Sequence, residues 1–429
     1  MRLATTLSLA LFASSLVSAS VIEKTKRKSN GKRYVVADND WLSTGYIPIL
    51  LAVDSDVELL AVTSVTGNTW QHECALHALA ALEIGNLSCI PVIEGAIYPL
   101  INTANRFQAW ETVHGALPWQ GVFAPYNATA EALGADPTSG TNPNRVSKNA
   151  FLEGFPNITA VEGKKAATYM VEMVNKYPGQ VSIYAAGAMT NVALAVRLDD
   201  NFARLAKELV IMGGYVDDNM YQATGTLNEA DINSDLNLMI DPEAAKIAIT
   251  APFPSITVVG NVANQVIPSQ EFLDDIYKVK NHYTTLMYEY YGTMFPFWDE
   301  TAMALLIDPT LATNTSVVYM DVDTAYGSPN YGNAHVYQKA YMPPNVRAVN
   351  YVNTIDAERF KAMIKHAVQH PKTCADLKEN PPAHNTREQE LKITISKEDS
   401  HCVSTVISVL KISPSPIALW LAGSILGAF

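Results

Sequence analysis

The sequence is poor in cysteine and in charged side chains. It has four cysteines among 429 residues, with no Cys-x-x-Cys pair, so a thiolate zinc site is not indicated. Charged residues make up 17% and hydrophobic residues 48%, which excludes the polar composition of a disordered chain and allows a large core. Basic residues are fewer than acidic ones, 30 against 42, for a net charge of -12. A nucleic acid is therefore not an expected partner, because a duplex binder needs a cationic face.

The amino-terminal residues have the pattern of a secretion signal. An apolar run over Leu3–Val17 follows Met1-Arg2 and ends at the small residues Ser18-Ala19. The run is shorter than the roughly 20 residues that span a bilayer, so we predict a signal peptide over residues 1–19 rather than a membrane anchor. Four Asn-x-Ser/Thr sequons are consistent with a secreted glycoprotein. They begin at Asn86, Asn127, Asn157 and Asn314.

The carboxyl-terminal residues differ in composition from the rest. Residues 20–369 carry the regular patterns of one folded domain, and residues 370–416 are typical of a linker or mobile tail. Residues 417–429 are an uncharged stretch of 13 residues, typical of a GPI-attachment signal with Ser400 or Ser404 as attachment site. An error in the assigned gene is the alternative. The prediction is a secreted, extracellular protein, with a lipid anchor at the cell surface if this signal is used.

The body of the chain alternates short β-branched runs with helical patterns. This order is typical of an α/β protein with an open, mostly parallel, Rossmann-like sheet and helices on both faces. The strands are expected at residues 34–37, 59–64, 90–93, 181–185, 208–212 and 255–259, and the helices at 71–84, 160–176, 188–198, 242–250 and 297–306. Residues 114–156 are expected to form a long surface loop, and such loops often cover a site.

The expected helix over residues 71–84 bears on disulfide pairing. Cys74 lies in that helix and Cys89 lies just after it, so our preferred pair is Cys74–Cys89. The alternative is that Cys74 packs in the helix as a small hydrophobic residue. Four cysteines allow three pairings, and Cys374 and Cys402 are the other two.

Carboxylates, amides and glycines follow the expected strands. Because an open parallel sheet binds ligands at the carboxyl ends of its strands, these residues should gather at one rim. None of the turns reads GxGxxG or GxxxxGK[ST], so a nucleotide-phosphate cradle is not supported. Amides beside glycines suit a polyol such as a sugar. The rim segments are Asp38-Asn39-Asp40, Thr66-Gly67-Asn68, Gly187–Asn191, Gly213-Gly214 and Gly260-Asn261.

Seven segments carry a resemblance to a known family. In chain order they are Asp38-Asn39-Asp40, LLAVTSVTGNTWQHECALHALAALEIGNLSCIPVIEGAIYPL, His114-Gly115, VSIYAAGAMTNVALAVRLD, ELVIMGGYV, NSDLNLMIDPEAAKIAI and FWDETAMALLIDP. Over roughly residues 33–369 the chain resembles the inosine-uridine nucleoside hydrolases, which are calcium-dependent nucleoside ribohydrolases. Each motif alone is weak, but seven in the family's order are strong.

The resemblance implies a calcium site and a set of catalytic and binding residues. Hydrolysis of an N-ribosidic bond passes through an oxocarbenium-like state and needs an activated water, anchors on the sugar and help for the departing base. The implied Ca2+ ligands are Asp38, Asp40, Asp299 and the Thr190 carbonyl. Asp40 is the implied general base, with Trp298 stacking on the base and His114 donating to it. The implied substrate contacts are Asn68, Asp235, Asn237 and Asn228.

Each of these residues also has a purely structural interpretation. Asp38 and Asp40 could cap a turn at a strand end, and Asp299 could cap the helix expected near Pro296. Trp298 could be core, and a lone histidine such as His114 is more often structural. The aromatic group from Tyr283 to Phe297 either lines a base pocket or forms a packed helix face.

The chain departs from the family pattern at two places. The family cluster reads Asp-x-Asp-Pro-Gly-x-Asp-Asp, but Thr44 and Gly45 stand at its last two positions, so cation affinity should be weaker. One branch of the family has His before the late Asp, whereas this chain has Trp298, which is similar to purine-preferring and plant-like members.

The sequence therefore predicts a secreted nucleoside hydrolase that releases free base and ribose, with the base preference open. One alternative is a catalytically impaired nucleoside- or ribose-binding protein, because Thr44 and Gly45 remove carboxylates. The other is a haloacid-dehalogenase-type phosphatase with Asp38 as nucleophile, although Leu42 stands where Thr is expected and only Asp217-Asp218 offers an acidic pair. The resemblance also implies a homo-oligomer.

Overall fold

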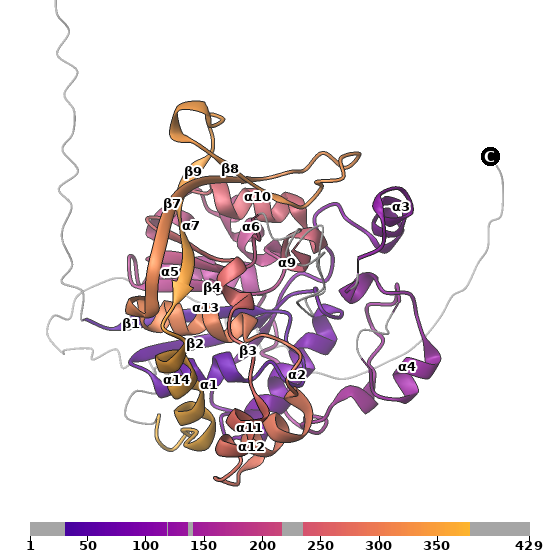
Figure 1. Cartoon of the computed structure of the whole chain (residues 1–429), viewed down its shortest axis with the longest axis vertical. Coiled ribbons are helices and arrows are strands. Elements are labelled where there is room, and N and C mark those ends of the chain that lie inside the picture. Colours follow the sequence, from indigo (N-terminus) through magenta and orange to yellow (C-terminus); the bar gives the residue numbers. More distant parts are fainter. Residues whose placement is uncertain (1–30, 118, 136–139, 217–234, 378–429) are drawn as a thin grey trace, which may run out of the picture. The chain divides into compact units, whose positions relative to one another are not determined.

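Nine strands form a single sheet in the computed structural model, counted over the residues it describes, 31–117, 119–135, 140–216 and 235–377. Their order is β3-β2-β1-β4-β5-β6-β9-β7-β8 (Figure 1). The described residues all belong to the unit that ends at Pro382. The expected signal peptide, the apolar tail, Asn228 and Asp217-Asp218 lie outside them.

The sheet is mostly parallel, as the sequence predicted. The pairings from β3 through β6 to β9 are all parallel, and only β7 pairs antiparallel with β9 and β8. The strands are β1 (Arg33–Asn39), β2 (Val57–Ser64), β3 (Val92–Glu94), β4 (Val181–Ala185), β5 (Glu208–Met212), β6 (Ile256–Val259), β7 (Ala312–Val322), β8 (Ala334–Tyr337) and β9 (Arg347–Ile355). Because β1 lies between β2 and β4, the chain leaves the first strand toward one edge and later returns on its other side.

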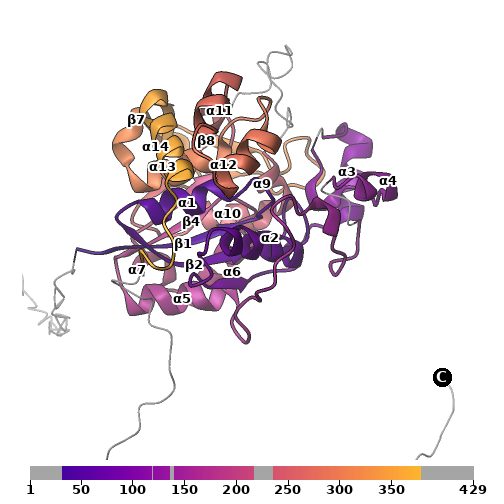
Figure 2. The same ribbon diagram turned by 90° about the horizontal axis from the view of Figure 1, so that it is seen from below.

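Helices cover both faces of the sheet, each over its own apolar cluster (Figure 2). One face carries α1 (Ile47–Asp54), α2 (Gln71–Ile84), α11 (Gln270–Ile276), α12 (His282–Leu286), α13 (Trp298–Ile307) and α14 (Ala357–Gln369). The other carries α5 (Ala166–Lys176), α6 (Thr190–Leu198), α7 (Phe202–Leu205) and α10 (Pro242–Thr250). This double cover explains why strands such as β4 are apolar at nearly every position instead of alternating.

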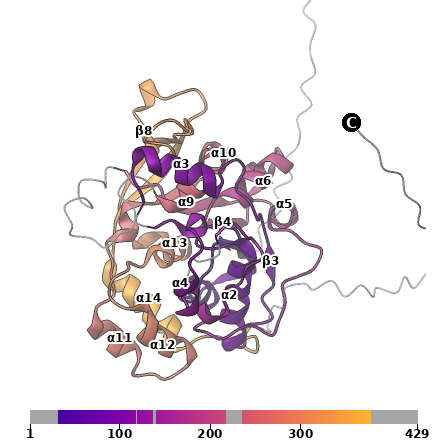
Figure 3. The same ribbon diagram turned by 90° about the vertical axis from the view of Figure 1, so that its right-hand side faces the viewer.

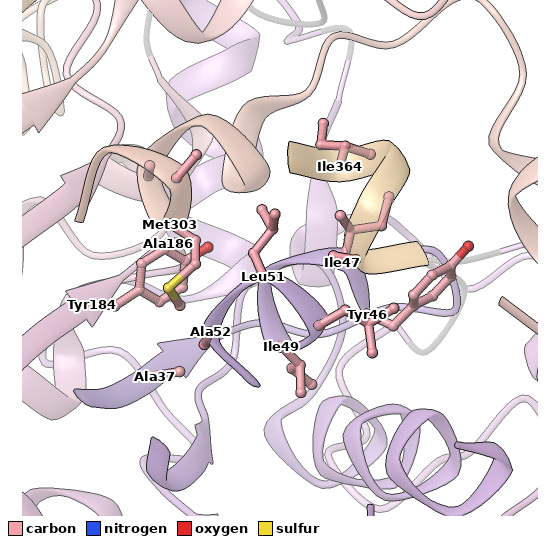
Figure 4. Close-up of a cluster of buried hydrophobic side chains, with 14 of the residues drawn as sticks. Ala37, Tyr46, Ile47, Ile49, Leu51, Ala52, Tyr184, Ala186, Met303 and Ile364 are labelled. Carbon is pink, nitrogen blue, oxygen red and sulfur yellow. The ribbon is translucent and has the colours of Figure 1, made fainter. Parts of the chain in front are cut away.

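Helix α1 shows how the first layer is built. Its sequence is apolar from Ile47 to Val53, all of which is buried, and Pro48 lies in its first turn, where a missing N–H costs nothing. Figure 4 shows Ile47 of α1 near Ile364 of α14, and Met303 of α13 beside Tyr184 of β4. A helix that is apolar all round must be enclosed by its neighbours, and α13 and α14 enclose α1.

The segment between β3 and α5 projects to one side of the sheet. It contains α3 (Ala104–His114) and α4 (Ala128–Ala132), which lie at the right of Figure 1 and face the viewer in Figure 3. The described part of the expected long loop over residues 114–156 contains one short α-helix, α4, and two 3-10 turns, Gly121–Phe123 and Lys148–Ala150. Among the described residues, no helix has the length and apolarity that crossing a bilayer requires.

The disulfide pairing differs from the prediction. Cys89 is bonded to Cys374, with a Cα–Cα separation of 5.8 Å, so the preferred Cys74–Cys89 pair is wrong. Cys74 lies in the first turn of α2, buried, and its thiol donates to the Thr69 carbonyl. Cys89 follows the last turn, and a helix of 14 residues is about 21 Å long, so α2 separates these two cysteines. Because Cys374 is joined to Cys89, the folded body extends beyond residue 369.

Candidate active site

A cavity of about 250 Å³ opens at the carboxyl ends of β1, β4 and β5. Ligands in open α/β sheets bind at the point where the strand order reverses, and here that point lies between β1 and β4. The cavity combines carboxylates and amides with aromatic rings. It is lined by Asn39, Asp40, Trp41, Leu42, Thr44, Gly45, Asn68, Trp119, Ala186, Met212, Tyr215, Asp235, Leu236, Asn237, Tyr291, Phe295, Pro296, Trp298, Asp299 and Glu300.

Asp40 is held at the end of β1 by the turn that follows β2. Its Oδ2 accepts from the Asn68 backbone N–H at 2.6 Å, and the Asn68 side-chain amide donates to the Asp40 carbonyl at 3.0 Å. A Cβ atom at Gly67 would lie 2.1 Å from Asp40 Oδ2, and one at Gly187 would lie 2.9 Å from Oδ1. Glycine is therefore required at both turns for this carboxylate to fit.

Asp299 reaches the same cavity from the first turn of α13. Asn39, the last residue of β1, joins the Asp40 backbone to the Asp299 carboxylate: its Oδ1 accepts from the Asp40 N–H and its Nδ2 donates to Asp299 Oδ2, both at 2.8 Å. The Tyr184 hydroxyl donates to the Asp299 carbonyl at 3.0 Å, which fixes the start of α13 against β4. The aspartates near residues 40 and 300 are thus brought together, as the resemblance implied.

Burial raises the pKa of these carboxyl groups. The pKa of Asp299 rises to about 7 through loss of solvation, against which the Asn39 hydrogen bond works. The pKa of Asp40 is raised well above its ordinary value, first by loss of solvation and then by the negative charge of Asp299. Two buried like charges that repel one another favour either a bound proton or a cation.

Asp38 lies behind this pair rather than among the lining residues. It is buried, and its Oδ1 accepts from the Thr63 hydroxyl at 2.6 Å and the Asn191 amide at 2.8 Å. Its Oδ2 has no hydrogen-bond partner among the described residues, and burial raises its pKa to about 7. Asp38 therefore orients the end of β1 against β2 and α6.

The donor chemistry of the cavity fits a divalent cation bound by carboxylates. Asp40 and Asp299 offer the oxygen ligands that hard cations such as Ca2+ take, and a cation would relieve their mutual repulsion. Thr44 and Gly45 line the cavity without adding a carboxylate. In the described part of the chain, no three Asp, Glu, His or Cys side chains group closely enough to hold a metal ion by themselves. Such a cation would depend on backbone carbonyls, water and substrate hydroxyls for its other ligands.

The predicted sugar contacts that can be described lie in the cavity. Asn237, in α9 (Leu236–Ile240), donates from Nδ2 to the carbonyls of Ala186 at 3.0 Å and Met212 at 3.1 Å. These strand-end carbonyls fix the amide and leave its oxygen to a ligand. Asp235 caps the same helix by accepting from the Leu238 N–H. Asn68 also lines the cavity.

Besides Asp38, two other predicted residues lie outside the lining. Thr190 begins α6, and its hydroxyl donates to Asp241 Oδ2 at 2.6 Å. His114 ends α3, where its ring lies 5.1 Å from that of Trp110. Neither is among the cavity residues, so the described lining contains no histidine that could protonate a leaving base.

Aromatic rings form much of the remaining lining. Trp298 lines the cavity, and its indole N–H donates to Asn264 Oδ1 at 2.7 Å. Trp119 was not predicted; its indole N–H donates to Asn68 Oδ1 at 3.3 Å. Of the aromatic group from Tyr283 to Phe297, Tyr291 and Phe295 reach the cavity, whereas Tyr283 is buried in the core.

Asn39 and Glu300 are two further residues that the sequence reasoning missed. Glu300 is buried beside Asp299, and its Oε1 accepts from the Tyr291 hydroxyl at 3.2 Å. Loss of solvation and the charge of Asp299 raise its pKa to about 8. Glu300 could have been predicted as a site residue because it follows Asp299 in the sequence, and Asn39 because it lies between Asp38 and Asp40.

The cavity thus combines side-chain amides, a pair of carboxylates and aromatic rings. The model of the inosine-uridine preferring nucleoside hydrolase family matches residues 35–362, and the chain belongs to this family. Hydrolysis of N-glycosyl bonds is the chemistry of that family.

The chain is also similar to individual proteins. The chain is 34% identical over 324 residues to an uncharacterized protein of Schizosaccharomyces pombe, covering 72% of this chain and 77% of that protein. It is 29% identical to uridine nucleosidase 1 of Arabidopsis thaliana, covering 59% of this chain and 64% of that one. A solved plant nucleoside hydrolase shares the fold, with a TM-score of 0.59 and 22% identity over 79% of this chain and 99% of that chain.

Proposed function

We propose that the chain hydrolyses the N-glycosidic bond of ribonucleosides to free base and ribose. The observation that carries the proposal is the pairing of Asp40 with Asp299, through Asn39, in a cavity that also holds amides and aromatic rings. Amides suit ribose hydroxyls, and rings suit a planar base. The family membership and the relatives named for uridine support the reaction class.

In the proposed mechanism, Asp40 is the general base toward the attacking water. Its rigid attachment to Asn68 and the end of β1 holds the carboxylate in one place, and such orientation contributes much of the rate of a hydrolase. Asp40 and Asp299 would hold a divalent cation, which would lower the pKa of a nearby water molecule. Asn237 and Asp235 bind the sugar, and Asn68 is the secondary contact.

Trp298 and Trp119 would flank the leaving base. Stacking on an aromatic face does not need hydrogen bonds to particular atoms of the base, so these two rings do not by themselves select one base. Because no described histidine lines the cavity, departure of the base would depend on stacking and on proton donors other than His114.

The test is to incubate the purified protein with inosine, adenosine, guanosine and uridine, with and without Ca2+, and to assay reducing sugar. Sugar release that is lost in Asp40→Ala and in Asp299→Ala supports the proposal. Asp199→Ala is a matched control, because Asp199 is a partly exposed helix cap outside the cavity. If the wild type releases no sugar from any of these nucleosides, the proposed function is wrong.

A nucleoside binder without catalysis is the second candidate, favoured by one observation. Thr44 and Gly45 line the cavity where carboxylates would add ligands for a cation. Binding of inosine by calorimetry without turnover would establish it. A phosphatase is disfavoured, because its nucleophile would be Asp38, which does not line the cavity.

We also propose that the protein is secreted and glycosylated. The Cys89–Cys374 disulfide needs an oxidising compartment. All four sequon asparagines, Asn86, Asn127, Asn157 and Asn314, are exposed, as glycosylation requires. Enzymatic removal of N-glycans from the secreted protein should lower its mass; an unchanged mass would contradict the proposal. The lipid anchor and the homo-oligomer stay predictions.

A further inference from the structure

Asn39 occupies an unusual position in the cavity. It is buried, with 1% of its surface exposed, and it stands between Asp38 and Asp40 at the end of β1. Its amide oxygen accepts from the N–H of the next residue, and its amide nitrogen donates to a carboxylate on α13. One side chain thus connects the central strand to the helix that carries the second acid.

Through this side chain, the Asp40 backbone N–H and the Asp299 carboxylate share one hydrogen-bond partner. The Asp40 carboxylate is fixed by Asn68 and by the close turns at Gly67 and Gly187. Asp299 Oδ2 accepts from Asn39 at 2.8 Å. A hydrogen bond to a charged acceptor is about twice as strong as a neutral one, and burial strengthens it further.

We propose that Asn39 is a positioning residue that fixes Asp299 relative to Asp40 and supplies, without charge, part of the stabilisation of the Asp299 carboxylate that a cation would provide. The amide N–H is directed at the buried carboxylate, while Thr44 and Gly45 leave the cavity with few acidic ligands. Its effect on turnover rests on the proposed function; its effect on cation response and stability does not.

The isosteric change Asn39→Asp tests this directly. It replaces the N–H donor by a third carboxylate oxygen next to Asp299, so the metal-free protein should unfold several degrees lower than wild type. The same change adds an acidic ligand, so Ca2+ should raise the unfolding temperature more than in wild type, and calorimetry should show at least tenfold tighter Ca2+ binding.

Asn102→Asp is the matched control. Asn102 is 2% exposed, its Oδ1 accepts from the N–H of the next residue, and its Nδ2 donates at 3.0 Å, but to the neutral Met239 carbonyl outside the cavity. This variant should lose stability too, yet its response to Ca2+ should equal that of the wild type. An equal Ca2+ response in Asn39→Asp and Asn102→Asp would overturn the inference.

Turnover supplies the second measurement. Asn39→Ala should lower kcat about a hundredfold with KM within about threefold of wild type, because a displaced acid costs rate more than binding. Full kcat in Asn39→Ala would also overturn the inference. If the wild type releases no sugar, the proposed function fails, and the Ca2+ response of Asn39→Asp against Asn102→Asp still decides the role of Asn39.

Discussion

The cavity has a carboxylate set, which is Asp40 and Asp299 with the amide of Asn39 between them, and an aromatic set, Trp119, Phe295 and Trp298. The carboxylate set stands on the end of β1 and the start of α13, and Asn39 and Asp40 are buried. In the aromatic set, Trp119 and Phe295 stand on connecting segments, and Phe295 is 44% exposed. The carboxylate set thus stands on a strand and a helix, whereas two of the three aromatic residues stand on loops, where binding residues are often found.

The loop that carries Trp119 is nevertheless tied down at several points. Glu111 of α3 accepts from the Leu117 N–H and from the Gln120 amide, both at 2.7 Å, and the Val122 N–H donates to the Gly67 carbonyl at 2.8 Å. Trp119 is therefore positioned through hydrogen bonds from its loop to α3 and to the turn after β2. We expect loss of these bonds to alter substrate affinity before it alters the chemical step.

The largest effect is expected from Asp40→Asn. The change keeps the shape but removes the proposed base, so kcat should fall by at least about a thousandfold. The metal-free protein should become more stable, because a buried charge facing Asp299 is removed. Steady-state kinetics and thermal unfolding measure the two effects, and kcat within tenfold of wild type would show that another group is the base.

Trp119→Ala should affect binding more than rate. Loss of one stacking face costs about 1–3 kcal/mol in base recognition, so kcat/KM should fall about tenfold to a hundredfold, mainly through KM. Trp119→Phe keeps a ring but loses the N–H donated to Asn68, and its effect should be smaller. A fall in kcat as large as that of Asp40→Asn would remove the distinction between the two sets.

The carboxylate set should also make stability depend on pH. The pKa of Asp299 is raised from 3.8 to about 7 in the folded protein, so the folded state binds more protons than the unfolded state between these values. In the metal-free protein, the contribution of Asp299 to stability should therefore be greatest below about pH 4 and should be lost as the pH rises to about 7. Asp299→Asn should flatten the curve of unfolding free energy against pH; an unchanged slope would contradict the raised pKa.

The smallest effect is expected from Glu111→Gln. One acceptor oxygen is kept and one becomes an amide nitrogen, which weakens the support of the Trp119 loop. KM should rise about twofold to fivefold while kcat and the unfolding temperature stay near wild type. Kinetics with inosine and uridine measure this change, and an altered kcat would mean that the loop also serves the chemical step.

Residues that depend on strand order were predictable, and those that depend on a distant partner were not. Asp40, Asn68 and Asn237 follow strands or their connections, and parallel strands end at one edge. The expected helix over 71–84 is α2 with the same bounds. The link from Asn39 to α13 and the Cys89–Cys374 bond, 285 residues apart in sequence, depend on how distant segments pack. No local spacing reports such packing.

The opposite departures of the chain from β1, toward β2 on one side and β4 on the other, create the crevice by connectivity alone. A hollow of this origin survives when the side chains around it change, since no packed layer has to be removed to make room for a ligand. Residues that line the crevice, such as Thr44 and Gly45, can accordingly differ from the acids of the family pattern while the scaffold still folds.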